Sequence, residues 1–352
     1  MAAFGSSGGL SLLESKREFA IEIWNGFIPI EFSLAESDLS ATESPDPYYT
    51  SVSRYSYISA AAEDVVSFFR TSAVDLSSHV WFEYQGVPLR ANVPIGCLFD
   101  MHGDGGILPW KVVVHFQWFP MGKIIMCCCR DDARRYFYHG LKQCMFILYG
   151  NLRSFSQLTE EDQTRLWESI AGGERLSFDV GVKGLIESRD SVRKVPLRAY
   201  VSVLVATGRG EEETEGGSGL QLSSSSGDAT PSLRHREYQL VQVSVPKRSI
   251  VGGQTSSSSS SDEFTVSEVL LRYILPSCIA ANTLSCSPEE LMRSTRVTCH
   301  GVDLDPTFDM CDAWELFRYA DLFMYWTVCV HIPVDSCAEV AATAAATERL
   351  QT

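Results

Sequence analysis

The chain has 352 residues, of which 45% are hydrophobic and 11% are aromatic, and its formal net charge is −15. This length predicts two or three domains, and the apolar content is ample for packed cores. No long basic run is present, which argues against a nucleic-acid groove and against a polybasic membrane anchor. The first residues also show no pattern from which we would expect a signal peptide, and no apolar run approaches the roughly 20 residues that cross a bilayer. We therefore expect a cytosolic protein that binds no nucleic acid.

The cysteines predict neither disulfides nor a metal site. There are eleven, an odd number, and three of them are consecutive, Cys127 to Cys129. In a cytosolic chain of this size we expect reduced thiols. A zinc site needs pairs spaced like C-x-x-C with further ligands downstream, and consecutive cysteines point in different directions. We predict no metal and no cofactor.

Three segments have a composition typical of disorder. Two are rich in Gly, Ser and acidic residues, around 208–232 and 251–263, and such segments cannot bury enough apolar surface to become ordered. The third is the Ala-rich stretch after Pro333, which has no apolar face with which to dock. We predict disordered insertions near 206–236 and 251–263 and a disordered tail at 334–352.

The first part of the chain alternates between strand and helix patterns. A helical pattern ends at Gly26, and residues 27–34, FIPIEFSL, alternate with the period of a half-buried strand. A second strand, a helix, two short strands and a last strand are predicted at 51–59, 61–74, 80–91 (hinged at Gly86) and 110–119. In the last strand we expect one face to carry Val112, Val114, Phe116 and Trp118.

This order of elements is that of a ubiquitin-like β-grasp unit, in which the helix packs across one face of a mixed sheet. We assign residues 27–124 to a first ubiquitin-like domain, after an N-terminal segment and helix at 1–26.

Residues 125–192 are predicted to form a helix-rich domain. One helix covers the stretch RRYFYHGLKQCMFILYG, residues 134–150. A second begins at a capping box that runs from Thr159 to Asp162. A third, weaker pattern is broken by Gly181 and Gly184.

Residues 193–333 repeat the order of the first part. Strand patterns at 195–205 and 238–245 precede a helix pattern at 264–276 and two more strand regions at 295–304 and 326–333. The predicted fold class is therefore α+β, with two ubiquitin-like β-grasp domains flanking the helix-rich domain. The insertions fall in loops of the second unit, where added length costs little.

Several short signatures occur in a fixed order along the chain. They include IWNGFIPIEFSL, WFEYQGVPLRANVPIG, LPWKVVVHFQWFP, EEDQTRLWESI, VPLRAYV, TCHGVDLDP and FMYWTVCVHIP. With these signatures the chain resembles the autophagy protein 5 family over most of residues 18–205 and 239–333. The resemblance implies two ubiquitin-fold domains around a helix-rich domain, in agreement with the patterns above.

The resemblance also implies a function. Members of this family are not enzymes on their own. They accept the C-terminal glycine of the ubiquitin-like autophagy protein 12 in an isopeptide bond to one lysine. The conjugate binds autophagy protein 16 and promotes transfer of autophagy protein 8 to phosphatidylethanolamine, which links it indirectly to autophagy proteins 3 and 8. This implies a cytoplasmic protein that is recruited to the preautophagosomal membrane, the growing autophagic membrane.

Lys142 matches the family's acceptor lysine, which lies near the start of the helix-rich domain. At about 100° per residue, a stripe of apolar residues should face the core, and Lys142 lies roughly 130° away from it, so its amine should be exposed. On the same side we place three aromatic residues that could form a docking surface for a partner. The core stripe is Phe137, Leu141, Cys144 and Leu148, and the docking candidates are Tyr138, Phe146 and Tyr149.

A second partner site is implied by the resemblance alone. A helix of autophagy protein 16 lies in a groove across the family's three domains, a common recognition mode. Trp24, Phe27 and Pro29 belong to a block that matches this region. They are candidates for the groove, and ordinary core positions are the alternative.

Other functions stay open on sequence grounds. The chain could be a ubiquitin-like scaffold that binds its partner without conjugation, with Lys142 an ordinary surface charge. The cysteines at 127–129 with His115 or His139 could indicate a thiol nucleophile, although no protease-like signature surrounds them. The acidic stretch 303–312 lacks the glycine and glutamate of a calcium loop, so we predict a turn there.

Overall fold

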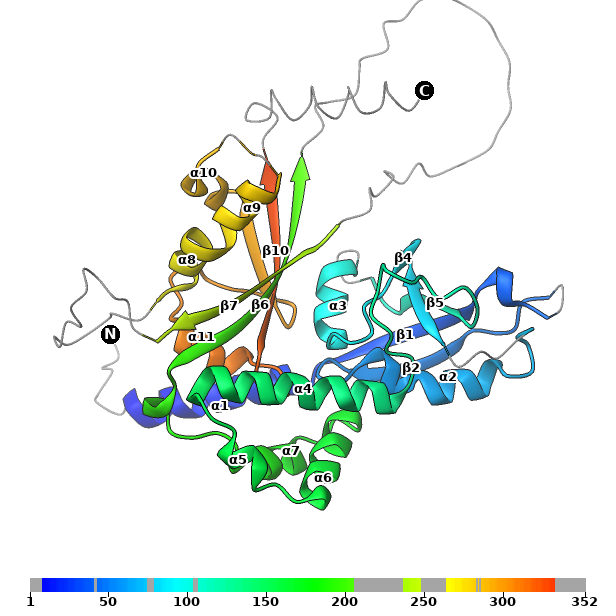
Figure 1. The fold of residues 1–352 in the computed structure, drawn as a ribbon, viewed down its shortest axis with the longest axis horizontal. Coiled ribbons are helices and arrows are strands. Elements are labelled where there is room, and N and C mark those ends of the chain that lie inside the picture. The colour runs from blue at the N-terminus through cyan, green and yellow to red at the C-terminus, as the bar shows by residue number, and fades with distance from the viewer. Residues whose placement is uncertain are drawn as a thin grey trace, which may run out of the picture.

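The computed structural model describes residues 8–40, 43–74, 79–103, 107–205, 237–247, 264–282, 284 and 286–332. The predicted disordered insertions and tail lie outside the described residues. Figure 1 shows two sheets side by side, with α4 running along the base of both and the shorter helices of the middle region beneath it.

The first sheet has the strand order β2-β1-β5-β3-β4, in which β1 and β5 are parallel and the other neighbours antiparallel. The elements of this part, with two short 3-10 helices η1 and η2, are α1 (Gly8–Trp24), β1 (Phe27–Leu34), η1 (Glu36–Asp38), β2 (Tyr48–Ser53), η2 (Ile58–Ala61), α2 (Ala62–Phe69), β3 (Trp81–Tyr84), β4 (Val87–Pro88), α3 (Ile95–His102) and β5 (Trp110–His115).

The middle region is helical, as predicted. Its elements are α4 (Arg130–Tyr149), α5 (Arg153–Ser156), α6 (Glu160–Ala171), α7 (Arg175–Lys183) and the 3-10 turn η3 (Arg189–Ser191). The predicted capping box is confirmed: the Thr159 hydroxyl accepts from the Asp162 N–H, and the Asp162 carboxylate accepts from the Thr159 N–H. This reciprocal pair satisfies two amides at the start of α6.

The second sheet has the order β7-β6-β10-β8-β9, which matches the first strand for strand, with β6 and β10 parallel. The elements of this part are β6 (Lys194–Val205), β7 (Gln239–Pro246), α8 (Val266–Val269), a π-helical turn η4 (Leu270–Ile274), α9 (Leu275–Asn282), α10 (Pro288–Met292), β8 (Thr295–Cys299), β9 (Val302–Asp303), α11 (Met310–Phe317) and β10 (Met324–Ile332). The two β-grasp sheets predicted from the sequence are present.

Pro29 and Pro196 occupy the same place in the two sheets. Each lies one residue before its strand begins the parallel ladder with the last strand of the sheet. In the antiparallel ladder, Pro29 faces Ser51 and Pro196 faces Ser244. Just beyond each ladder, the Arg54 N–H donates to the Gly26 carbonyl and the Lys247 N–H donates to the Arg193 carbonyl. Because bonded pairs alternate along an antiparallel ladder, both prolines lie at non-bonded positions. The missing N–H of proline therefore costs neither sheet a hydrogen bond.

The two sheets meet at a buried junction. Arg54, just after β2, pairs with Asp100 of α3, and the Gly301 N–H donates to the other oxygen of that carboxylate at 2.9 Å. The His300 ring stacks on Tyr319 with 3.8 Å between centroids. Burial, aided by the charge of Arg54, holds the pKa of His300 well below its usual range. The histidine is therefore neutral and acts as a packed ring between the two domains.

Some local predictions were wrong. The strand predicted at 51–59 ends at Ser53, and η2 follows instead. The last strand of the first domain ends at His115, so Trp118 does not share the core face of Val112 and is 82% exposed. Gly181 lies inside α7 and does not break it. A Cβ on Gly181 would lie 3.1 Å from a methyl of Leu166, so glycine allows α6 and α7 to approach closely.

Candidate functional site

Lys142 lies on the outer side of α4 and is exposed, as the helix periodicity predicts. The four residues of the predicted core stripe are all fully buried: Phe137, Leu141, Cys144 and Leu148. They pack where α4 contacts β6 and η2. This burial fixes the rotation of α4 and holds the Lys142 backbone in place, while the side chain extends away from the core.

The Lys142 amine has one close aromatic neighbour. Its Nζ lies 4.8 Å from the centroid of the Phe155 ring, which belongs to α5 and is nearly buried. A cation over an aromatic face gains about 0.5–1 kcal/mol at an exposed site. The contact orients the amine without enclosing it, so Lys142 can be reached by a second protein.

The three predicted docking aromatics have different environments. Phe146 is 61% exposed. Tyr138 is half-buried, and its hydroxyl donates to the Gln163 carbonyl in α6. Tyr149 is only 3% exposed, and its hydroxyl accepts from the Glu187 N–H at 3.1 Å. The placement of Tyr149 in an exposed patch was therefore wrong, because the segment after α7 returns over the end of α4.

Two of the three groove candidates are on the surface. Trp24 is buried: its ring stacks on Phe178 of α7 at 4.6 Å, and its Nε1 donates to the Gly173 carbonyl at 3.0 Å. Phe27 is 48% exposed, and its ring edge lies 3.1 Å from where a Cβ on Gly173 would be. Pro29 is exposed. Trp24 thus joins α1 to α7, while Phe27 and Pro29 present apolar surface beside this joint.

A buried ion pair that the sequence patterns did not reveal contacts α4 at Gln143, the residue after Lys142. Arg198 of β6 donates to the side chain of Gln143 at 2.9 Å and to the Tyr325 hydroxyl at 2.7 Å. Its Nη1 lies 3.6 Å from Asp321, which is only 1% exposed and accepts from the Tyr325 hydroxyl at 2.7 Å. Burial raises the pKa of Asp321, and Arg198 opposes that shift. The pair connects the second sheet to α4 at Gln143 and Gly140.

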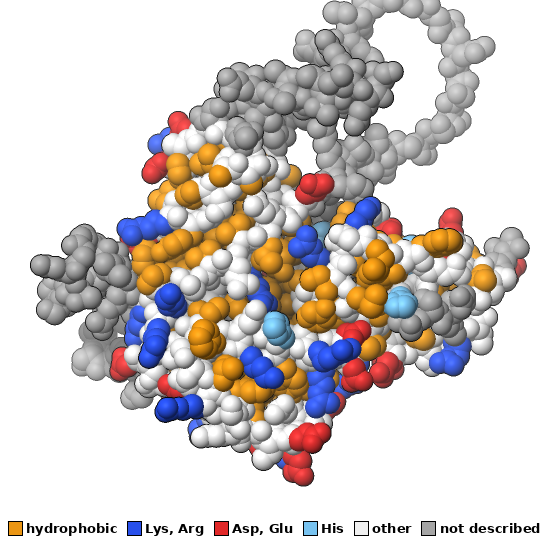
Figure 2. All heavy atoms as spheres, in the orientation of Figure 1, with side chains coloured by type: hydrophobic (Ala, Val, Ile, Leu, Met, Phe, Trp, Pro, Cys, Tyr) orange, Lys and Arg blue, Asp and Glu red, His pale blue; other side chains and the backbone are white. Residues whose placement is uncertain are grey.

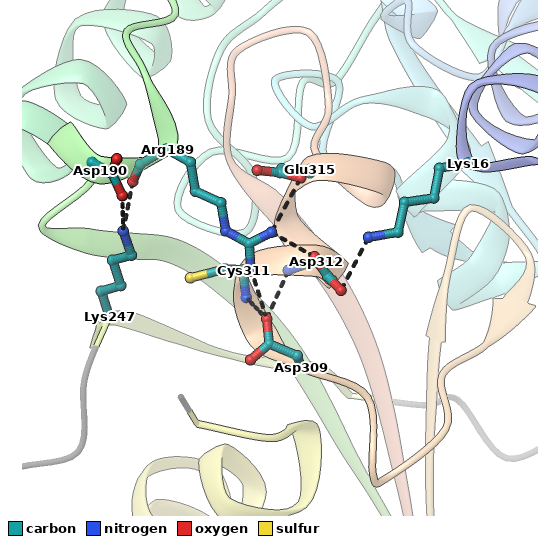
Figure 3. A network of polar contacts seen from close by, with 8 residues as sticks. All are labelled: Lys16, Arg189, Asp190, Lys247, Asp309, Cys311, Asp312 and Glu315. Atoms are coloured by element: carbon teal, nitrogen blue, oxygen red, sulfur yellow. Dashed lines mark hydrogen bonds and ion pairs between the residues drawn. The ribbon is translucent and has the colours of Figure 1, made fainter. Parts of the chain in front are cut away.

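Figure 3 shows a second polar network, which joins three parts of the chain. Arg189 of η3 donates to Asp312 of α11 at 2.7 Å and lies 3.6 Å from Glu315. Asp312 also lies 3.1 Å from Lys16 of α1. These side chains are partly exposed, so each pair contributes about 0–1 kcal/mol. Together they hold α1 and the segment after α7 against α11.

Cys127 and Cys128 lack the environment of a nucleophilic thiol. Burial raises the pKa of the Cys127 thiol to about 12 and that of Cys128 to about 11. A nucleophilic cysteine needs its pKa lowered instead. His115 is engaged elsewhere, stacked on Trp81 with 3.8 Å between ring centroids. Neither the raised pKa values of these thiols nor the position of His115 supports the thiol-nucleophile alternative.

The acidic stretch before α11 acts as a helix cap, which fits the predicted turn. Asp309 accepts from the N–H groups of Cys311 and Asp312, each at 2.9 Å. Among the described residues, no group of three or more His, Cys, Asp or Glu side chains could hold a metal ion. Nor does any helix within the described ranges have the length and apolar character needed to span a membrane.

Three family models match the chain in the order of its three parts. They are the UblA domain, the alpha-helical bundle region and the UblB domain of "Autophagy protein ATG5", at residues 23–116, 130–180 and 194–330. The chain belongs to the autophagy protein 5 family. Membership of this family supports a role as a scaffold in autophagy and agrees with the two ubiquitin-like domains seen here.

Relatives in this family include proteins from fungi and plants. An autophagy protein 5 from Penicillium rubens is 29% identical over 203 residues, covering 52% of this chain and 64% of the relative. That of Oryza sativa subsp. japonica is 30% identical over 156 residues, covering 44% and 41%. The chain thus spans less than two thirds of these relatives' length.

A solved structure shows the same fold. The crystal structure of Kluyveromyces marxianus Atg5 superposes with a TM-score of 0.61 at 19% identity, covering 88% of this chain and 99% of that chain. Two ubiquitin-like domains flanking a helical bundle are therefore the architecture of this chain, as its sequence predicts.

Proposed function

We propose that this chain is the acceptor of the ubiquitin-like autophagy protein 12, joined to it through the amine of Lys142. The observation that carries the proposal is an exposed lysine on a helix whose opposite face is fully buried. Such a lysine is held at a fixed place and remains accessible. The acceptor lysine of the family lies in this same helix-rich region.

The reaction requires only an accessible neutral amine from the acceptor. The neutral amine attacks the thioester carbonyl that a conjugating enzyme holds at the C-terminal glycine of autophagy protein 12. A C–N bond forms, the C–S bond breaks, the enzyme's thiolate leaves and the amine's proton passes to solvent. The Lys142 ammonium must first lose a proton and so give up its contact with Phe155. No catalytic group of this chain is required, and the chain is a non-catalytic subunit.

The surface around the lysine supports docking of that partner. Phe146 is a largely exposed aromatic residue one helical turn beyond Lys142, and Tyr138 lies one turn before it. Exposed aromatic side chains are common anchors in protein interfaces. The docking surface therefore comprises Phe146 and the exposed part of Tyr138, without Tyr149.

A helix of autophagy protein 16 binds separately, beside the joint of α1 and α7. Phe27 and Pro29 supply exposed apolar surface there, and Trp24 supports them from below. An apolar helix face laid into such a surface is a common recognition mode. The resulting complex promotes lipidation of autophagy protein 8, with autophagy protein 3 as an indirect partner. It works in the cytoplasm and at the preautophagosomal membrane.

The deciding experiment is mass spectrometry of the protein isolated from its own cells. We expect a branched peptide at Lys142 that carries the C-terminal residues of autophagy protein 12. Lys142→Arg should abolish the adduct while the fold survives. Lys111→Arg, at an exposed lysine of β5, is the matched control and should leave the adduct unchanged. An adduct that persists in Lys142→Arg contradicts the assignment.

A non-covalent scaffold is the second candidate, and one observation favours it. The Lys142 amine already has a partner in this chain, the ring of Phe155, which it contacts as a cation. Under this alternative, the two proteins co-purify without a branched peptide, and Lys142→Arg leaves their association intact because arginine keeps the cation over the ring.

The groove has its own test. Phe27→Asp should weaken binding of the autophagy protein 16 helix by about tenfold or more, measured by calorimetry, with little change in the melting temperature. Tyr49→Asp replaces a similarly exposed aromatic residue of β2 and is the control. Equal affinity for both variants would place the helix elsewhere.

A further inference from the structure

The strand β7 is an outer strand of the second sheet. It pairs with β6 over eight consecutive residues without a bulge, from Lys194↔Pro246 to Val201↔Gln239. Its sequence, QLVQVSVP, contains no charged residue. Natural proteins usually protect such a long and uncharged edge with charges, prolines, bulges or a covering element, because it can pair with another strand.

The register shows which backbone groups of β7 point outward. The Lys247 N–H donates to the Arg193 carbonyl at 3.2 Å, and bonded pairs alternate along an antiparallel ladder. The residues bonded to β6 are therefore Gln239, Val241, Val243 and Val245. The N–H and C=O groups of the residues between them face away from the sheet: Leu240, Gln242 and Ser244. Pro246, which has no N–H, ends this free edge.

The equivalent edge of the first sheet is more protected. Two prolines, Pro45 and Pro47, come directly before β2, and its last residues, Val52 and Ser53, are buried. In β7 the outward residues Leu240 and Gln242 are exposed. Within the described part of the chain, no hydrogen bond engages the outward backbone groups of β7. The β2 edge is therefore shorter than that of β7: its outward residues Tyr49 and Ser51 are exposed, and it ends at the buried Ser53.

The surroundings of β7 indicate what would bind there. Figure 2 shows hydrophobic side chains gathered over the part of the surface where Figure 1 draws β7 and α8. Two basic residues, Arg193 and Lys194, are exposed at the end of β7 near Pro246, whereas the amine of Lys247 is already engaged by Asp190 and the Arg189 carbonyl. An added strand would therefore find apolar surface along β7 and positive charge at one end.

We infer that β7 binds an extended segment of another protein by strand addition, with apolar residues along β7 and acidic residues at its basic end. Main-chain hydrogen bonds to Leu240, Gln242 and Ser244 supply the pairing, and the side chains supply the selectivity. The β7 strand of a second copy is a poorer occupant, because it has no acidic residue to pair with Arg193 and Lys194. This surface is distinct from Lys142 and does not depend on the proposed conjugation.

The first test asks whether the edge is free in the protein alone. Residue-resolved amide exchange of the full chain should show an alternation along β7. The amides of Val241, Val243 and Val245 should be protected, and those of Leu240, Gln242 and Ser244 should exchange much faster. If all six amides are protected equally, a segment of the same chain or a second copy already fills the edge, and the inference is wrong. A mass measurement in solution separates those two cases.

The second test uses a fluorescein-labelled synthetic peptide in which a run of valine and isoleucine precedes a run of glutamates. Binding should shift the amide signals of Leu240, Gln242 and Ser244. Gln242→Pro removes an outward donor without removing a hydrogen bond to β6, as Pro196 already does in its own strand, and should weaken binding about tenfold. Ser51→Pro makes the same change on the β2 edge and should have no effect.

A charge variant provides a second binding test that does not depend on whether Gln242→Pro folds. Lys194→Glu should weaken binding of the acidic peptide several-fold and leave binding of a glutamine-substituted peptide unchanged. No binding by the chain, or equal binding by all three variants, overturns the inference. Loss of the Lys142 adduct would have no bearing on either result.

Discussion

The Nζ of Lys142 lies 4.8 Å from the centroid of the Phe155 ring, so the proposed acceptor amine on α4 is oriented by a residue of α5. Phe155→Leu should keep the apolar contact and remove the π face. Because such a contact is worth about 0.5–1 kcal/mol, acylation of Lys142 by an N-hydroxysuccinimide ester should become roughly two to five times faster. Lys111, exposed on β5, serves as the reference within the same spectrum. An unchanged ratio would show that the ring does not hold the amine.

Phe146 and Tyr149 should respond in opposite ways to substitution. Phe146→Ser removes an exposed ring, so conjugation should slow about fivefold or more while the melting temperature stays the same. Tyr149→Phe removes the hydroxyl that accepts from the Glu187 N–H. That change should lower stability by about 1–2 kcal/mol and leave the conjugation rate unaltered. A reconstituted conjugation assay and thermal unfolding together distinguish a docking residue from a core residue.

Removing Arg198 should leave a buried charge without its partner. In Arg198→Met, Asp321 stays buried without the opposing guanidinium. Breaking one side of such a pair costs about 3–5 kcal/mol. Urea denaturation at pH 7 measures this loss directly, and a loss below about 1 kcal/mol would show that the pair is dispensable.

The same variant should be less destabilised in acid. The folded-state pKa of Asp321 is raised above its ordinary value by burial and held down by Arg198, so Arg198→Met raises it further. The folded state then binds more protons than the unfolded state between the unfolded pKa, about 3.9, and the raised one. Stability therefore falls as the pH rises through that window. The difference from the natural protein should be smaller at pH 5 than at pH 7, and a constant difference would contradict this account.

Gly140→Ala should destabilise the protein although it lies within α4. Alanine in a helix interior is normally more favourable than glycine by about 1 kcal/mol. Here a Cβ would lie 2.8 Å from the Asp321 carboxylate, so α4 would have to move away from the second sheet. We expect a net loss of about 1–3 kcal/mol in thermal or urea unfolding. Gly184→Ala is the control, because nothing lies within 4 Å of its Cβ position.

Cys128 should react slowly with alkylating reagents. Its pKa is raised from 9.0 to about 11 by burial, so the thiolate fraction at neutral pH falls by about a hundredfold relative to an unshifted thiol. Iodoacetamide labelling at pH 7, followed by mass spectrometry, should modify Cys128 far more slowly than free glutathione. Labelling as fast as glutathione would revive the thiol-nucleophile alternative.

The sequence by itself determined the features that depend on neighbours along the chain. The alternation in residues 27–34 placed Ile28 and Ile30 in the core, the capping box fixed the start of α6, and the helical period placed Lys142 outside. Each depends on backbone geometry within a few residues. The signatures that resemble the family likewise revealed the order of the three domains.

Only the tertiary structure showed which residues that the sequence pattern predicts to be exposed are buried by distant parts of the chain. Tyr149 lies on the lysine side of α4 by its helical angle, yet it is buried because a segment 38 positions further along bonds to it. Arg198 and Asp321 meet only because β6 and the residues before β10 are neighbours in space. The sequence predicted β7 as a strand, but only its register with β6 shows which amides face outward. Periodicity gives the direction of a side chain, whereas burial depends on contacts between distant parts of the chain.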